Sequence, residues 1–291
     1  MDFAQQLVNG VQIGSVYALV AIGYTMVYGI AKMINFAHGD IIMVGSYVAL
    51  LFFQSSGLPV WGVIAATATV SAVLGVTIER LAYKPLRGGS RMSALITTIG
   101  VSLMLQNGFL LIFGSSPKPF PNHFTGEGFT LGGVTVSRLT AITLVVTVVL
   151  MVLLTLFVNR TRVGKAMRAV SEDQGAAQLM GINIDTSISI TFAIGSALAA
   201  VAAVLYSSTY PLINPYMGSM LGLRAFIAAV IGGIGVIPGA MIGGFIIGIA
   251  EALIKRYISS AMADAIVFAL LIIVLLVKPS GLLGRNEREK V

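Results

Sequence analysis

Residues 35–40 hold the side chains best suited to a chemical role in this chain. Asn35, His38 and Asp40 lie there together, at the join between two apolar runs. Polar and ionisable groups at membrane depth are costly and usually face a helix bundle or a transport pathway. One interpretation is structural: Asn35 and Asp40 cap two half-helices, with Asp40 preceding Ile41 as an N-cap that the helix dipole favours. The other is a role in a pathway or a gate. The two interpretations are compatible, and both stay open.

Other patterns that bind metals or phosphates are missing. His38 is an improbable metal ligand, because the one other histidine is His123 and the chain has no cysteine. Gly164-Lys165 is followed by Ala166 and lacks the upstream glycine of a phosphate-binding loop. No Ser/His/Asp arrangement is evident. We therefore expect no enzyme activity, no metal site and no cofactor bound by this chain, and any ATP hydrolysis belongs to another subunit.

Two further pairs have simple structural interpretations. Glu251 precedes Lys255 by four residues, which is the favourable order for an ion pair along a helix, and we prefer this to a role in proton coupling. Glu79 and Arg80 are expected to form an ion pair at the membrane interface.

The elements that position these residues must lie in lipid. The chain of 291 residues is 57% hydrophobic and only 10% charged, whereas soluble domains average about 25% charged residues. The net charge of +7 comes from short basic segments between apolar runs, so it indicates membrane orientation and not nucleic-acid binding. Residues 1–6 hold no basic residue, so the first apolar run is expected to be a retained span. The sequence predicts one all-α integral membrane domain over residues 1–291.

About eight hydrophobic segments are long enough to be spans, since a crossing helix needs roughly 20 apolar residues. They cover residues 7–30, 34–53, 58–82, 92–113, 139–158, 187–206, 225–254 and 261–277. Two places predict broken or re-entrant helices, near residues 31–40 and 232–239. In the second, Gly232, Gly233, Gly235 and Pro238 leave backbone groups unpaired, so this bend must lie inside protein or line a wet cavity.

Charge counting favours a hairpin at residues 225–254, which enters from outside, bends and returns. With the N-terminus outside, this topology places 13 of the 18 Lys and Arg residues on the cytoplasmic side, against 11 if residues 225–254 cross once. Residues 114–137 then form the largest external loop, and Pro117, Pro119 and Pro121 predict that it is irregular.

Residues 159–185 form the predicted cytoplasmic loop, with Arg160, Arg162, Lys165 and Arg168 near its start. Its second half predicts a short helix over 171–181, with Ser171 as N-cap and Gly181 as the stop. A capped helix outside the bilayer is a natural docking surface for a soluble partner. The residues expected to take part are Glu172, Asp173, Ala176, Ala177, Leu179, Met180 and Gly181.

Several motifs in the right order make the chain resemble the LivH-type permeases of bacterial branched-chain amino-acid ABC importers. They are Asn35 to Asp40 with Met43, Gly45 and Tyr47; Tyr83 to Arg87; Ala169 to Asp173 through Ala176-Ala177 to Gly181-Ile182; and Ala228 to Gly235 with Pro238-Gly239. One position departs from the general importer pattern of Glu-Ala-Ala, three residues, Gly: Gly175 replaces the glutamate, and Glu172 lies one turn earlier.

The resemblance implies a bacterial inner-membrane protein that works in a complex. The implied partners are a second, related permease, two cytoplasmic ATP-binding subunits that hold the ATP, and an external solute-binding protein. ATP binding would then move the helix over 171–181 as a rigid element and switch the bundle between outward-open and inward-open states. The implied cargo is leucine, isoleucine or valine, although amide and urea importers have related permeases.

Two other classes of transporter remain as alternatives, each for a small neutral solute such as urea or an amide. A passive channel can contain re-entrant half-helices, but it needs no capped cytoplasmic helix. An ion-coupled transporter normally shows buried ionisable relays along several spans, and here His38, Asp40 and Glu251 are the candidates.

Overall fold

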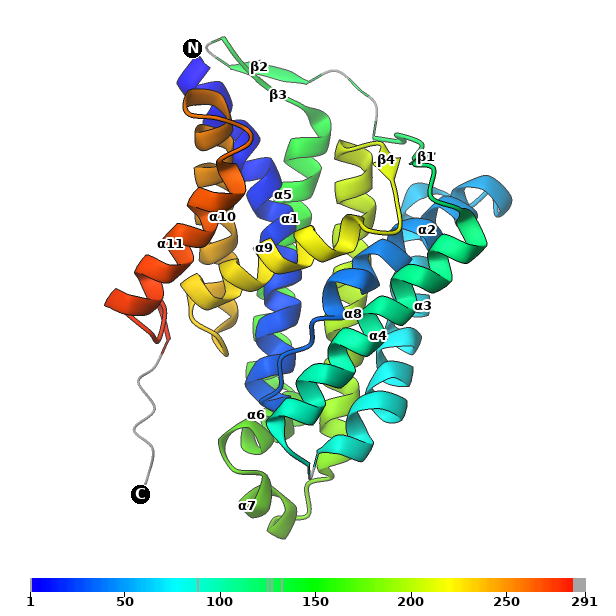
Figure 1. Ribbon diagram of the computed structural model, residues 1–291, viewed down its shortest axis with the longest axis vertical. Helices are drawn as coiled ribbons and strands as arrows, with labels where there is room; N and C mark the ends of the chain where they lie inside the picture. The colour runs from blue at the N-terminus through cyan, green and yellow to red at the C-terminus, as the bar shows by residue number, and fades with distance from the viewer. Residues whose placement is uncertain (1, 88, 125, 127, 132, 285–291) are drawn as a thin grey trace.

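The computed structural model describes residues 2–284 except positions 88, 125, 127 and 132, and this part of the chain is mostly helical (Figure 1). Six of its helices are long and apolar enough to cross a membrane. These spans correspond to α1 (Asp2–Ala31), α3 (Val60–Ile78), α4 (Arg91–Phe113), α5 (Arg138–Arg160), α8 (Ile184–Thr209) and α10 (Ile237–Tyr257), and the span that starts with α3 continues to Leu86. Shorter apolar helices are α2 (His38–Ser55), α9 (Met217–Gly232) and α11 (Ala263–Val277). The predicted all-α membrane fold is confirmed, with α9 and α10 sharing one of the predicted segments.

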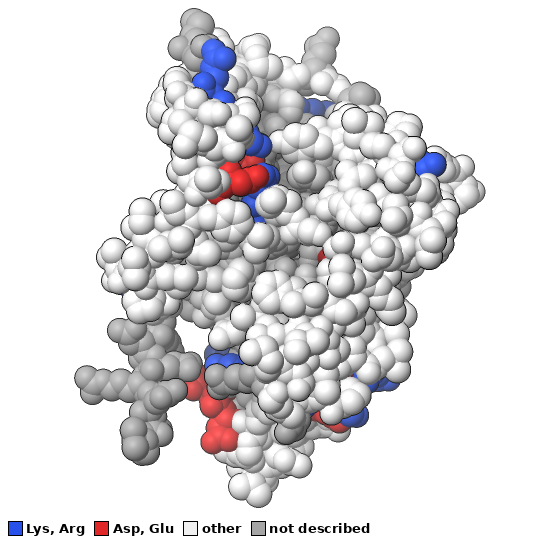
Figure 2. Space-filling model, in the orientation of Figure 1, with Lys and Arg blue, Asp and Glu red and all other residues white. Residues whose placement is uncertain are grey.

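Helices α1 and α8 form the centre of the bundle. The most apolar stretches of these two helices are 83% and 78% buried, whereas those of α4 and α5 are only 22% and 17% buried. Since apolar side chains of α4 and α5 point outward, these helices face the lipid. Figure 2 shows charged side chains gathered toward the two ends of one face and, between them, a wide band that is uncharged except for one small acidic spot. That band is what a bilayer requires.

The predicted break near residues 31–40 is present, but its predicted caps are wrong. Helix α1 ends at Ala31, Lys32 takes a positive φ of 53°, and α2 begins at His38. No side chain caps the start of α2, and Asp40 lies inside its first turn. Asn35 and Asp40 are 2% and 1% exposed, so partners on other helices bind their side chains instead of the local backbone.

The second break forms the predicted hairpin. Helix α9 ends at Gly232, and Gly233 and Gly235 take φ values of 107° and 93° that glycine tolerates best. Pro238 then lies in the first turn of α10, where its missing N–H costs nothing.

Backbone groups at the end of α9 find partners in the tail of the chain. The N–H groups of Leu282 and Leu283 donate to the carbonyls of Ile231 and Gly232, at 2.8 and 3.0 Å. The bend is therefore satisfied inside protein, as membrane chemistry demands.

Close contact between α1 and α10 shows which way the hairpin runs. A Cβ on Gly10 would lie 2.6 Å from Ile249 Cα, and one on Gly248 would lie 2.3 Å from Gly14 Cα, so the two helices are antiparallel and touch through glycine. The end of α10 therefore lies beside the start of the chain, whereas α6 (Arg162–Glu172) and α7 (Gln174–Leu179) lie at the opposite end of the bundle (Figure 1). This is the arrangement of a hairpin, not of a single crossing.

The described residues of the loop at 114–137 contain no further span, but they are less irregular than the prolines predict. Strand β2 (Phe129–Leu131) pairs antiparallel with β3 (Val134–Val136), and β1 (Lys118–Pro119) pairs with β4 (Leu212–Ile213). Gly133, with φ of 85°, supplies the tight turn between β2 and β3. Gln5 exchanges two hydrogen bonds with the backbone of Thr135, at 2.9 and 3.0 Å, and so fixes this hairpin to α1.

A buried charged cluster anchors the re-entrant helix near the same end. The predicted pair of Glu251 and Lys255 is present at 2.5 Å, and Glu251 also accepts hydrogen bonds from Tyr17 at 2.6 Å and Arg224 at 3.0 Å. Arg224, on α9, pairs further with Asp264 on α11. Four helices therefore meet at one neutralised cluster, which favours the structural interpretation of Glu251.

Candidate functional site

The predicted helix over 171–181 consists of two elements that meet at Asp173. Ser171 and Glu172 end helix α6, and Ser171 donates its hydroxyl to the carbonyl of Arg168 at 2.7 Å, so Ser171 is not an N-cap. Asp173 has an extended backbone and accepts the Ala176 N–H at 2.9 Å. The N-cap of α7 is therefore Asp173, two residues later than predicted, because the chain turns there from one helix axis to another.

The predicted stop at Gly181 is confirmed. Gly181 takes a φ of 80°, and its N–H donates to the carbonyl of Gln178 at 3.0 Å. The N–H of Ile182 reaches back to the carbonyl of Ala177, also at 3.0 Å. These bonds satisfy the free carbonyls at the end of the helix and fix its exit into α8.

Helix α7 has one buried and one strongly exposed side. Ala177 is 3% exposed, whereas Leu179 and Met180 are 90% and 82% exposed. Helix α7, which ends at Leu179, lies at the end of the bundle away from the start of the chain (Figure 1), where water would contact these apolar side chains. Exposed apolar side chains in such a place mark a surface for a protein partner.

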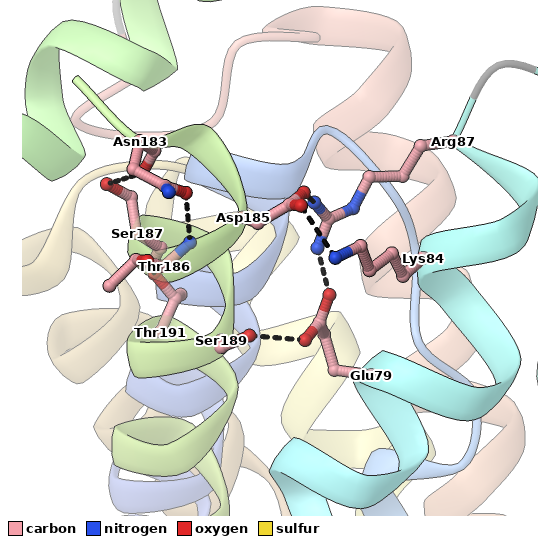
Figure 3. Close-up of polar contacts among 9 residues, drawn as sticks. All are labelled: Glu79, Lys84, Arg87, Asn183, Asp185, Thr186, Ser187, Ser189 and Thr191. Carbon is pink, nitrogen blue, oxygen red and sulfur yellow. Dashed lines mark hydrogen bonds and ion pairs between the residues drawn. The ribbon is translucent and has the colours of Figure 1, made fainter. Parts of the chain in front are cut away.

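An ion-pair network lies where α3, α4 and α8 meet (Figure 3). Fully buried Glu79 pairs with Arg87 and accepts the Ser189 hydroxyl at 2.5 Å. Arg87 also pairs with Asp185 at 2.5 Å, and Lys84 pairs with the other oxygen of Asp185 at 2.7 Å.

The expected pair of Glu79 with Arg80 is therefore wrong. Helix α3 passes into a π-helical turn, η1 (Glu79–Tyr83), and then a 3-10 turn, η2 (Lys84–Leu86). A π-helical turn is wider than an α-helical turn, and a 3-10 turn is tighter. Together they direct the chain so that Arg87, and not the adjacent Arg80, pairs with Glu79.

A surface groove links this network to α7. Its lining includes Arg87 and Asp185 on one side and Gln174, Gln178 and Gly181 on the other. Sequence reasoning missed Arg87, Asp185 and Ser189 as site residues. The available signal was Glu79 near the end of an apolar run, because a buried carboxylate needs a cationic partner. Only the fold shows that this partner is Arg87 and not the adjacent Arg80.

The two breaks meet at a narrow crevice. Asn35 and Ile34 from the first break and Ile234 from the second line it, together with Tyr24 and Phe226. Of the predicted bend residues only Asn35 lines this crevice, although Ile234 lies between the predicted Gly233 and Gly235. The predicted residues on α7 form a separate group at the end of the bundle. Among the described residues, no cluster of His, Cys, Asp and Glu could hold a metal ion.

Around the first break, each polar side chain contacts a different helix. Asn35 accepts the Tyr83 hydroxyl at 2.6 Å. The His38 ring lies edge-on to Tyr24, with ring centroids 4.6 Å apart, and Asp40 accepts a hydrogen bond from Gln106 at 2.9 Å. These contacts join the non-helical segment to η1 and the first turn of α2 to α1 and α4.

Comparison with known proteins gives one consistent result. Residues 6–275 match the family described as branched-chain amino acid transport system / permease component. The permease protein BraD of Pseudomonas aeruginosa is 48% identical, covering 99% of this chain and 98% of that protein. The permease protein LivH of Escherichia coli K12 is 49% identical with the same coverage. Both are named as permeases of a high-affinity branched-chain amino acid transport system.

One solved structure is similar over most of its length. PsaBC from Streptococcus pneumoniae in complex with Fab shares 15% identity and a TM-score of 0.48, covering 96% of this chain and 93% of that one. The family assignment depends on the sequence relatives alone. This multi-pass inner-membrane protein belongs to the family of branched-chain amino acid transport system permease components.

Proposed function

We propose that this chain is the permease subunit of an ATP-driven importer that moves branched-chain amino acids across the membrane by alternating access. The observation that carries the proposal is α7, a capped helix outside the apolar band that exposes Leu179 and Met180. The near-full-length relatives support the cargo, since their names state it.

The chain's partners in this proposal are a second related permease, two cytoplasmic ATP-binding subunits and an external solute-binding protein. ATP binds to the partner subunits, and this chain binds no cofactor. Leu179 and Met180 enter a pocket on one ATP-binding subunit, with Glu172, Asp173 and Ala176 at the edge of the contact.

Movement of α7 reaches the bundle by two routes. Gly181 and Ala177 fix α7 directly to the start of α8. Asp185, in the first turn of α8, binds Arg87 and Lys84, which join α8 to the corner between α3 and α4. Closure of the ATP-binding subunits therefore shifts α3, α4 and α8 together, as a two-state change requires.

Reconstitution tests the proposal directly. The complete complex in proteoliposomes, supplied with loaded binding protein, should take up leucine with ATP inside and take up none with ADP. Uptake that proceeds equally without ATP would instead support the passive channel. Uptake that follows an imposed proton gradient would support the ion-coupled transporter, although the full pairing of Glu251 argues against a proton relay there.

Cysteine labelling tests the proposed topology, and the chain has no natural cysteine to interfere. Ser260→Cys, in the exposed turn between α10 and α11, should react with an impermeant maleimide added outside the cell. Gln174→Cys, at the start of α7, should react only after permeabilisation. Ser260 is a better probe than Lys255, because Lys255 pairs with buried Glu251. Reversed labelling of the two positions would place α7 outside and overturn the coupling role.

A further inference from the structure

Three buried side chains at the first break each keep a polar atom without a hydrogen-bond partner. They are the amide nitrogen Nδ2 of Asn35, Nε2 of His38 and the carboxylate oxygen Oδ2 of Asp40. Each residue is at most 2% exposed. A buried polar group without a partner costs about 1–3 kcal/mol, so three in one short segment need an explanation.

Asp40 differs from the other buried carboxylates of the described chain. Glu79 and Glu251 each form ion pairs with basic side chains. Asp40 forms no ion pair with a described residue, and its Oδ1 accepts from neutral Gln106 at 2.9 Å. Unpaired acids inside a membrane protein usually mark a pathway.

The surroundings of Asp40 join three helices. Gln106 on α4 donates to Asp40 on α2 and also to Ser219 on α9, the latter at 2.8 Å. Beside this contact the backbones of α2 and α9 touch: a Cβ on Gly39 would lie 2.4 Å from the Gly218 carbonyl oxygen. The start of the re-entrant helix α9 therefore covers Asp40 in this conformation.

An apolar crevice begins at the first break. Tyr24 lines the crevice and holds the His38 ring edge-on, and Asn35 lines the crevice itself. The other walls include Val27, Ile34, Phe226, Ala229 and Ile234. The crevice thus offers an amide donor and aliphatic walls between the two broken segments, and Asp40 lies on α2, five residues beyond Asn35.

We propose that Asp40 Oδ2 binds the α-ammonium group of an amino-acid cargo when α9 moves away from α2. The Asn35 amide donates to the cargo carboxylate, and the aliphatic side chain enters the crevice. A zwitterion with a branched apolar side chain requires this set of groups. This inference rests on the proposed function, which supplies the class of cargo.

Asp40→Asn tests the role with little structural change, because the asparagine oxygen can still accept from Gln106. We expect leucine uptake by the reconstituted complex, at saturating loaded binding protein, to fall at least about 30-fold, as for loss of one partner in a buried charge pair. The melting temperature of the complex should stay near that of the wild type. The drop should be in turnover, with an unchanged KM for the loaded binding protein, since that protein docks at the outer face.

Two variants of α4 complete the test. Asn107→Leu changes the exposed neighbour of Gln106 and should leave uptake near the wild-type rate. Gln106→Leu removes the bond to Asp40 but keeps the free carboxylate, so it should reduce uptake less than Asp40→Asn. Near-normal uptake by Asp40→Asn, or a larger loss in Gln106→Leu, would show that Asp40 only braces the helices. A wild-type complex that moves no amino acid would instead defeat the proposed function, and this inference with it.

Discussion

Replacing Leu179 and Met180 together by glutamate is expected to abolish ATP-driven uptake and co-purification with the ATP-binding subunits. These side chains are 90% and 82% exposed, so the change leaves the fold of the permease intact. In the complex, two apolar anchors would become unpaired charges in a buried pocket. Each central anchor of a protein interface is worth at least about 2 kcal/mol, or about 30-fold in affinity. Affinity purification followed by uptake assays measures both effects.

An exchange at the same positions provides the matched control. The double variant Leu179→Met and Met180→Leu keeps the apolar surface and should assemble and transport nearly as the wild type does. A glutamate variant that still binds the ATP-binding subunits and transports leucine would show that α7 is not the coupling surface.

Arg87→Leu is expected to have the largest effect on stability. It leaves Glu79 fully buried with only the Ser189 hydroxyl as partner. Breaking a buried ion pair from one side costs about 3–5 kcal/mol, so the purified permease should unfold at a clearly lower temperature. Transport should fall as well, since Arg87, which follows η2, also links the corner between α3 and α4 to Asp185 on α8.

A second substitution separates the charge effect from lost contacts. Glu79→Gln in the Arg87→Leu background removes the unpaired charge and keeps an acceptor for Ser189, so the double variant should be more stable than Arg87→Leu. Thermal unfolding of the wild type and the two variants in detergent measures this. If the double variant is as unstable as Arg87→Leu, the buried charge is not the cause.

The sequence was most informative where the chain meets lipid or bends within it. Length and hydropathy predict the spans, and Gly232 to Pro238 predict the hairpin, because no other backbone is tolerated at that depth. A glycine at position 181 predicts the end of α7, because glycine readily takes the left-handed backbone conformation that ends a helix. The structure shows this conformation at Gly181. Glu251 and Lys255 lie four residues apart on one helix, so their spacing alone predicts the ion pair.

Errors arose where tertiary contacts replaced local ones. Asp40 has the form of an N-cap, yet Gln106, 66 residues away, binds its carboxylate. Glu79 is adjacent to Arg80 in the sequence, yet its carboxylate pairs with Arg87, because the chain turns through a π-helical segment after Ile78. Ser171 and Asp173 are both good caps, and only the change of helix direction decides between them. None of these outcomes can be derived from spacing along the chain.

Cross-linking from position 180 in the intact complex tests the central claim most directly. A cysteine at this position, introduced as Met180→Cys into a chain without natural cysteines, carries a photoactivatable cross-linker. Leu111→Cys, on the lipid face of α4 and 86% exposed, is the control. The account predicts a permease–ATPase product from position 180 and none from position 111. Absence of that product, or cross-linking of position 180 to the external binding protein, would contradict it.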